Sequence, residues 1–224
     1  MSKQNDLIGR RAMITGLGVG TVALAAGAGG ARAAQGAAPA PRWQPTLDPQ
    51  DAWMELPGQH RFMFDSTSPE GTGHSLHYAR NFYTANKEGY GLAASALAVI
   101  IVLRAEPTVF GYNDKMWQKY GGELSKIVKL EQIHKVNPYN EAAEGLGNHG
   151  VTLSSLSTDG AHFAICGMGT RFISHLLAEK TQGNADDIHK EIAANLIPGG
   201  HLVSAGIAAV NRAQERGYAL SYTN

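Results

Sequence analysis

Ala96-Leu97-Ala98-Val99-Ile100-Ile101-Val102-Leu103 is a run of eight apolar residues with no polar residue inside it. A strand with one solvated face alternates apolar and polar side chains, whereas a strand buried on both faces is apolar throughout. Strands of the second kind belong to parallel sheets that are covered by helices on both faces. The run therefore predicts a central strand of a parallel sheet, in a protein of the α/β class.

Strand and helix patterns alternate on both sides of this run. Further strands are predicted at 61–65, 161–166, 201–203 and 218–222. Helices are predicted at 74–87, 113–120, from Thr170 to before Gly183, around 186–196, and from Ser204 to before Gly217. Residues 121–150 read as a loop with room for one short helix, and 151–156 fits a helix or a strand. The alternation predicts a three-layer α/β sandwich with a mainly parallel sheet of about five strands, whose ligands bind at the carboxyl ends of the strands.

The composition excludes several classes of function. The 224 residues include 19 Lys and Arg against 19 Asp and Glu, nine His and one Cys. With no basic excess to neutralise phosphates, a nucleic-acid partner is not expected. A single Cys excludes an internal disulfide and any zinc site that needs two or four Cys ligands.

The first 33 residues have the pattern of an export signal. Arg10-Arg11 is followed by an apolar stretch rich in Ala and Gly, and Ala31-Arg32-Ala33 fits a small-x-small cleavage site. Gly9-Arg10-Arg11-Ala12-Met13-Ile14 resembles a twin-arginine signal, which implies export of a folded protein to the periplasm. We expect cleavage after residue 33 and no stable membrane span afterwards, because so many Ala and Gly residues make a poor membrane anchor.

Two parts are expected after the signal. Residues 34–59 contain five Pro residues and little periodicity, which predicts an extended arm. Residues 60–224 then form one α/β domain, a length that suits a single core. Without residues 1–33 the chain has 15 basic and 18 acidic residues, a net charge of about −3.

Cys166 is the principal candidate for chemistry. It ends a predicted strand and precedes by four residues a helix predicted to begin at Thr170. Free N–H groups and the positive end of a helix dipole stabilise a thiolate, which can carry sulfur as a persulfide. Gly167 and Gly169 would let the backbone approach the sulfur, and Met168, Thr170 and Arg171 complete the expected site. The alternative is a buried Cys that only packs.

The order of motifs around Cys166 resembles the DsrE/DsrF-like family of small α/β sulfur-relay proteins. After the strand come Cys166-Gly167-Met168, a helix, Leu196-Ile197-Pro198-Gly199, another strand, and finally Ala208 to Tyr218, with the sequence AAVNRAQERGY. Upstream, Val99 to Arg104 is similar to the family's second strand and following loop. Asn113-Asp114-Lys115-Met116-Trp117 and Asn137-Pro138-Tyr139 resemble its exported, twin-arginine branch.

This resemblance implies a flavodoxin-like sheet, a homo-oligomer, and a Cys that accepts and passes on sulfur. Cys166 occupies the corresponding strand end, and Arg104 and Asn113 join it as expected binding residues. The chain has no second Cys to resolve a persulfide internally. Its expected partner is therefore a separate sulfur donor or acceptor, either a protein or a small sulfane-sulfur compound. A non-catalytic oligomeric binding or assembly module of the same fold is the alternative function.

Flavin and metal sites are minor alternatives, and neither a cofactor nor a metal is expected. The Ser-, Thr- and Gly-rich segment 65–73 could cradle a phosphate, although Glu70 opposes this and a simple helix cap explains it better. His74 and His77 could share a helix face, with His162 near Cys166, but two ligands do not complete a site. For an oligomer interface, the sequence suggests exposed aromatic residues at Trp117, Tyr120 and Tyr139.

Overall fold

The computed structural model describes residues 44–141 and 146–224. The expected signal at 1–33 and residues 34–43 of the expected arm lie outside the described residues.

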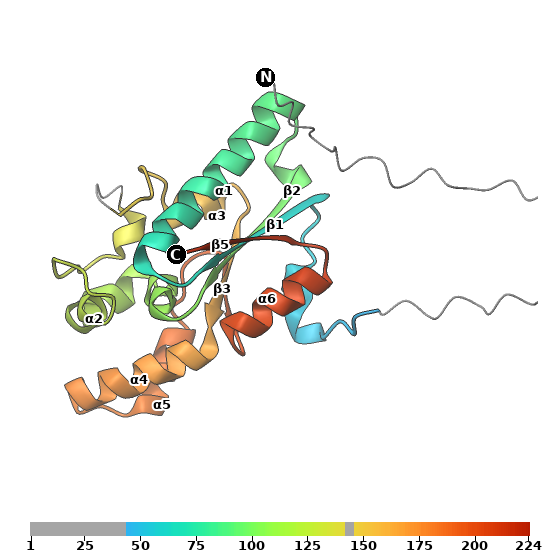
Figure 1. The fold of residues 1–224 in the computed structure, drawn as a ribbon. Helices are drawn as coiled ribbons and strands as arrows, with labels where there is room; N and C mark the ends of the chain where they lie inside the picture. The colour runs from blue at the N-terminus through green and yellow to red at the C-terminus, as the bar shows by residue number, and fades with distance from the viewer. Residues whose placement is uncertain (1–43, 142–145) are drawn as a thin grey trace, which may run out of the picture. The chain divides into compact units, whose positions relative to one another are not determined.

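A five-stranded sheet forms the centre of the domain (Figure 1). Its strands are β1 (His60–Ser66), β2 (Leu97–Leu103), β3 (His162–Cys166), β4 (Gly200–Val203) and β5 (Ala219–Thr223). They pair in the order β4-β3-β2-β1-β5, and every pair is parallel. All seven residues of β2 are buried, as the apolar run predicts for a central strand. The predicted α/β class and three-layer, flavodoxin-like architecture are confirmed.

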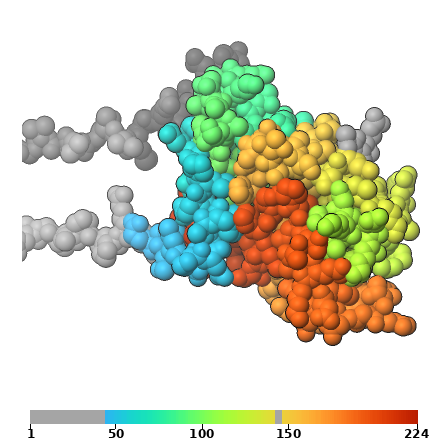
Figure 2. Space-filling view, turned by 180° about the vertical axis from the view of Figure 1, so that it is seen from behind, coloured from blue at the N-terminus to red at the C-terminus, as the bar shows by residue number. Residues whose placement is uncertain are grey.

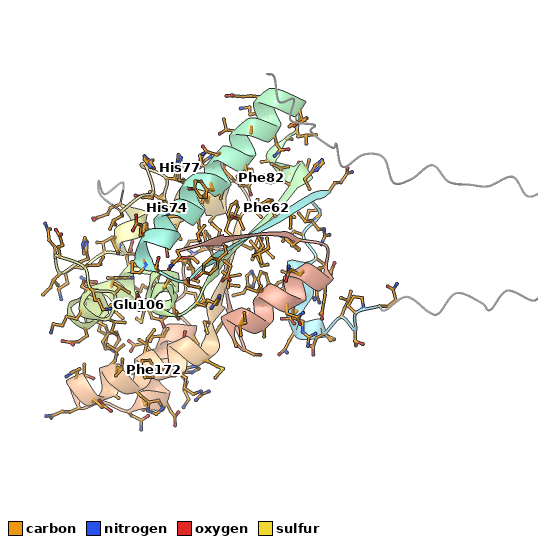
Figure 3. The ribbon with its side chains drawn as sticks, viewed as in Figure 1. Phe62, His74, His77, Phe82, Glu106 and Phe172 are labelled. Carbon is orange, nitrogen blue, oxygen red and sulfur yellow. The ribbon has the colours of Figure 1, made fainter. Side chains whose placement is uncertain are left out.

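Most helices cover one face of this sheet. They are α1 (Pro69–Tyr90), α2 (Asp114–Ile127), α3 (Leu153–Thr158), α4 (Gly167–Thr181) and α5 (Ala185–Ala193), with 3-10 turns η3 (Glu106–Gly111) and η4 (Pro138–Asn140) between them. Their apolar side chains form one core cluster with alternate residues of the strands, including Phe64, Val99, Ile101 and Phe163. Figure 3 shows one contact of this layer, in which Phe82 of α1 lies against Phe62 of β1, with ring centroids 5.3 Å apart.

The opposite face has a thinner cover. It consists of α6 (Gly206–Glu215) and the 3-10 turn η1 (Pro49–Met54), which pack on Met63, Ile100, Val102 and Ala164. Helices of the first face lie in the connections from β1 to β2, from β2 to β3 and from β3 to β4. The connection from β4 back to β5 contains α6, which covers the opposite face. The chain ends beside the beginning of α1 (Figure 1), where Gly71 lies against Thr223.

Residues 44–59 do not form the expected extended arm throughout. Asp48 caps η1, the side chain of Met54 is fully buried, and the Tyr218 hydroxyl donates to the Met54 carbonyl at 2.8 Å. Figure 2 shows this segment, in blue, against the C-terminal part of the domain in red. The folded part thus begins before His60, because Trp53 and Met54 supply apolar surface that a Pro-rich composition does not reveal.

Several helix boundaries differ from those predicted. Helix α1 begins at Pro69 rather than His74, since Ser68 caps it and Pro fits the first helical turn. Helix α2 continues to Ile127, well beyond Tyr120. Helix α4 begins at Gly167, so Thr170 is not its cap. Ser204 does not cap α6 either, because the N-cap is Ala205 and no side chain bonds there.

The aromatic residues expected at an interface are part of the core. Trp117 and Tyr139 are fully buried and Tyr120 is nearly so. Trp117 stacks on Phe110, and Tyr139 meets the edge of the same ring. The interpretation of these three side chains as exposed was wrong, because the segment between β2 and β3 folds as a layer over the sheet rather than as a loop. In the described residues, no helix has the length and apolar character needed to cross a membrane.

Candidate functional site

At the carboxyl ends of β3 and β4 the chain leaves the sheet toward opposite faces. After β3 the chain enters α4 on the first face, whereas after β4 it enters α6 on the opposite face. In open α/β sheets, ligands bind in the crevice where neighbouring connections diverge in this way. Cys166 pairs with Val203 across this point. The topology and the sequence therefore both indicate Cys166 as the candidate functional residue.

Cys166 is at once the last residue of β3 and the N-cap of α4. Its Sγ accepts a hydrogen bond from the Gly169 N–H at 3.3 Å, and the residue is 8% exposed. The helix begins at the next residue, not four residues later. The sulfur is thus directly at the N-terminus of a 15-residue helix, where the dipole favours negative charge.

Gly167 and Gly169 allow two close backbone approaches at this helix start. A Cβ on Gly167 would lie 2.4 Å from the Val203 carbonyl oxygen of β4. A Cβ on Gly169 would lie 2.6 Å from Oγ1 of Thr108, which follows β2 in η3. The Thr108 hydroxyl is buried and has no hydrogen-bond partner within the described part of the chain. The sequence predicted that these glycines let the backbone approach the sulfur. In the structure they also let β4 and η3 pack closely against the first turn of α4.

Arg104, directly after β2, adds a cation to the site. Its guanidinium makes two hydrogen bonds to the Asp65 carboxylate at the end of β1, with Nε–Oδ1 and Nη2–Oδ2 distances of 2.7 and 2.8 Å. These hydrogen bonds raise the pKa of Arg104, and smaller contributions in the same direction come from Tyr222 and Cys166. The guanidinium is thus fixed by a nearly buried carboxylate. Because Leu103 pairs with Ile165, Arg104 and Cys166 come directly after paired residues at the ends of adjacent strands.

Two buried hydroxyl groups lie behind the first turn of α4. The Tyr112 hydroxyl donates to Oγ1 of Thr170 at 3.1 Å, and both residues are fully buried. Burial raises the pKa of Tyr112, and Cys166 contributes in the same direction. Thr170 therefore anchors α4 to the segment after β2 rather than capping the helix.

Three expected site residues have other surroundings. Arg171 is 62% exposed in its side chain and lies 3.9 Å from Asp186 of α5, so it belongs to the α4–α5 pair. Asn113 caps α2, accepting from the N–H groups of Lys115 and Met116, and its own N–H donates to the Asn195 carbonyl. Met168 is 69% exposed on the outer side of α4. The described contacts do not bring Arg171 or Asn113 to the sulfur.

The segment 65–73, considered as a minor alternative for a phosphate cradle, is occupied by the protein's own groups. Ser68 Oγ accepts from the Gly71 N–H at 2.9 Å, which confirms the simple helix cap. Ser66 and Thr72 hydrogen-bond to each other at 2.8 Å. A Cβ on Gly71 would meet Thr223 at 2.6 Å, so the end of β5 covers this helix start.

Five of the nine histidines form two clusters. His74 and His77 lie on one side of α1 (Figure 3), where His77 also meets His149 with ring centroids 4.4 Å apart. On the opposite face of the sheet, Nδ1 of His162 lies 2.9 Å from Nε2 of His201, and the His201 ring stacks on Trp53. No group of three or more metal-ligand side chains occurs in residues 44–141 and 146–224.

Sequence reasoning missed Asp65, Thr108 and Tyr112 as neighbours of the site. Asp65 carried a usable signal, because a carboxylate directly after the apolar residues Phe62-Met63-Phe64 is expected at the carboxyl end of a strand. The segment 104–113 was expected at this edge because it follows a predicted strand, but Thr108 and Tyr112 were not singled out within it, since their positions depend on how the chain folds after β2. Comparison of the chain with protein-family models, curated proteins and solved structures found no match.

Proposed function

We propose that this protein is a DsrE-like sulfur carrier in which Cys166 is converted to a persulfide and passes its sulfur to a second molecule. The observation that carries the proposal is the position of Sγ, at the N-cap of α4 and bonded to the Gly169 N–H. A thiolate at that point is stabilised by the backbone N–H group and the helix dipole. The Arg104 guanidinium, paired with Asp65, lies at the end of the neighbouring strand β2.

The transfer is a pair of exchange steps without net oxidation. The Cys166 thiolate attacks the terminal sulfur of a donor persulfide, and a new S–S bond forms as the donor's S–S bond breaks. The bonding electron pair leaves on the donor thiolate, and the terminal sulfur keeps its proton or negative charge. An acceptor thiolate then attacks that outer sulfur and releases the Cys166 thiolate. Because the chain has one Cys, both donor and acceptor are other molecules.

Mass spectrometry of the intact protein tests this function. After incubation with glutathione persulfide and removal of excess reagent, the wild type should gain the mass of one sulfur atom, and dithiothreitol should remove it. Cys166→Ser is the matched control, because Ser also caps a helix N-terminus but cannot form a persulfide. A wild type that gains no sulfur, or a Cys166→Ser variant that gains as much, would contradict the proposal.

The second candidate is a non-catalytic binding or assembly module. The low exposure of Cys166, 8%, favours it, since a packed thiol is inert. Iodoacetamide labelling at neutral pH separates the two functions. Alkylation faster than that of free cysteine supports the carrier, whereas a thiol labelled only after unfolding supports the module.

Export and self-association complete the proposal. We propose delivery to the periplasm through the paired Arg10 and Arg11, so that replacing both with Lys retains the protein in the cytoplasm in cell fractionation.

We also propose a homo-oligomer, supported by large apolar side chains that remain exposed at Met168, Phe172 and Ile207. Light scattering of the purified protein measures its mass, and a monomer at micromolar concentration would refute this part.

A further inference from the structure

Tyr112, which follows η3, links the segment after β2 to the first turn of α4. Its hydroxyl donates to Oγ1 of Thr170 at 3.1 Å, and both side chains are fully buried. Burial raises the pKa of Tyr112, so the hydroxyl keeps its proton and can donate. Thr170 directly follows Gly169, whose N–H donates to the sulfur of Cys166. The residue that Tyr112 tethers is therefore the neighbour of the thiol's backbone donor.

The backbone of Tyr112 is itself held by two segments that are distant in sequence. Asn137, which is fully buried, donates through Nδ2 to the carbonyl oxygens of Phe110 and Tyr112, at 2.7 and 2.9 Å. Tyr112 also forms an isolated antiparallel bridge with Leu196, which precedes β4. A hydroxyl on a backbone fixed in this way is a rigid point of attachment, because it cannot follow a helix that moves away.

The other contact between the first turn of α4 and η3 is of a different kind. Gly169 packs against Thr108, whose buried hydroxyl has no hydrogen-bond partner among the described residues. Such packing limits how closely the turn can approach η3 but gives little resistance to its withdrawal. Within residues 44–141 and 146–224, the only side-chain hydrogen bond between this turn and another element is that from Tyr112 to Thr170.

We propose that Tyr112 is a positioning residue for Cys166, which keeps the Gly169 N–H directed at the sulfur by tethering Thr170. Tyr112 acts through Thr170 and does not touch the sulfur donor. Without the tether, the first turn of α4 opens locally more often, and the thiolate loses its backbone donor each time. The functional meaning of this role rests on the proposed sulfur chemistry, whereas the positioning is a property of the folded chain.

Two measurements on Tyr112→Phe test the role. Hydrogen exchange of the Gly169 amide, followed by NMR, should be about two- to tenfold faster than in the wild type, the factor expected for one lost hydrogen bond. Ultraviolet absorbance of the thiolate, with the spectrum of the corresponding Cys166→Ser protein subtracted, should appear at a higher pH, by up to about one unit. Tyr139→Phe is the matched control, because Tyr139 is fully buried too and its hydroxyl donates to the Pro69 carbonyl at the start of α1. It should change neither quantity.

A double variant separates positioning from stability. Tyr112→Phe alone leaves Oγ1 of Thr170 buried without its donor and should lower the melting temperature. Tyr112→Phe with Thr170→Val removes both partners at nearly the same shape, so the melting temperature should return toward the wild-type value while the fast Gly169 exchange remains. Thr170→Ser keeps the acceptor and should exchange at the wild-type rate.

The proposal is overturned if either quantity in Tyr112→Phe equals that of the wild type. It is also overturned if the double variant recovers both the melting temperature and the slow Gly169 exchange, because Tyr112 would then serve stability alone. None of these outcomes depends on sulfur transfer. The sulfur carrier fails on a different result, a wild type that gains no sulfur from glutathione persulfide.

Discussion

Gly167 determines the position of the first turn of α4, because it has no side chain. The first turn of α4 can follow β3 without a loop because its backbone passes close to the Val203 carbonyl of β4, 2.4 Å from where a Cβ would stand. A backbone oxygen cannot rotate away as a side chain can. Any larger residue must therefore push α4 away from β4 and displace the sulfur of Cys166.

Gly167→Ala is expected to lower the free energy of unfolding by about 2 kcal/mol, because it forces this contact apart. Gly122→Ala is the matched control, since a Cβ at Gly122 of α2 meets nothing within 4 Å. It should raise stability by up to about 1 kcal/mol, as Ala favours helix over Gly. Urea denaturation of both variants measures the difference, and equal effects would show that the contact with Val203 is unimportant.

The His162–His201 pair makes stability depend on pH. Burial, and then repulsion from His162, lower the pKa of His201 to about 4. Burial also lowers the pKa of His162. In the unfolded chain both imidazoles have an ordinary pKa of about 6.5. Between these values the unfolded state binds more protons than the folded state, so stability decreases as the pH falls from about 6.5 to about 4.

His201→Gln should flatten this part of the stability profile. After allowance for solvent screening of a half-buried side chain, the wild type should lose about 1–2 kcal/mol from this residue over the interval. His175→Gln, at an exposed position on α4, should retain the wild-type slope. Melting temperatures measured across the interval provide the test, and parallel curves for wild type and His201→Gln would contradict it.

At the scale of the element, α4 begins directly from a strand and is capped by a cysteine. The Cys166 Sγ accepts from Gly169, a role that Ser, Thr, Asp or Asn fills in most helices. Cys166→Ala removes this cap and should lower stability by about 1 kcal/mol. Cys166→Ser restores an acceptor and should be closer to the wild type in thermal denaturation. Equal loss in both variants would indicate that packing of the sulfur, not capping, stabilises this junction.

The strands were predictable to within a residue or two, whereas the starts of α1 and α4 were not. The apolar run at 96–103 differs from β2 by one residue, because burial on both faces leaves a direct trace in composition. Helix starts depend on which polar side chain reaches a free N–H group. Ser68 does so for α1, Cys166 for α4 and Asn113 for α2, and only the last was assigned correctly.

The strand ends that make up the candidate site were predictable, whereas the segments packed behind them were not. Cys166 could be placed at the end of a strand from the residues before it, and Arg104 from the end of the apolar run. Asp65 ends the neighbouring strand β1 and could have been found in the same way, whereas the position of Tyr112 depends on how the chain folds after β2. Arg171 was included for its place in a first helical turn, and the structure pairs it with Asp186 of α5 at 3.9 Å.

At the scale of the whole molecule, the two faces of the sheet are unequally covered. Within residues 44–141 and 146–224, five helices protect one face, whereas the other depends on α6 and on a segment that precedes the first strand. That segment is held by Trp53 stacked on His201 at 4.1 Å, by Arg216 bonded to Glu55 at 2.8 Å, and by Gly58 against Ala98. The residues before β1 therefore function as part of the third layer.

Met54→Ala should show how much this layer contributes to the free energy of unfolding. The Met54 side chain is fully buried, so its truncation leaves a cavity between η1 and the sheet and should lower stability by about 3 kcal/mol. Leu47→Ala is the matched control, because Leu47 is 50% exposed and should change stability by less than about 0.5 kcal/mol. Chemical denaturation of both variants distinguishes the alternatives. If Met54→Ala were as stable as Leu47→Ala, residues 48–59 would be an arm resting on the domain, and α6 alone would protect this face.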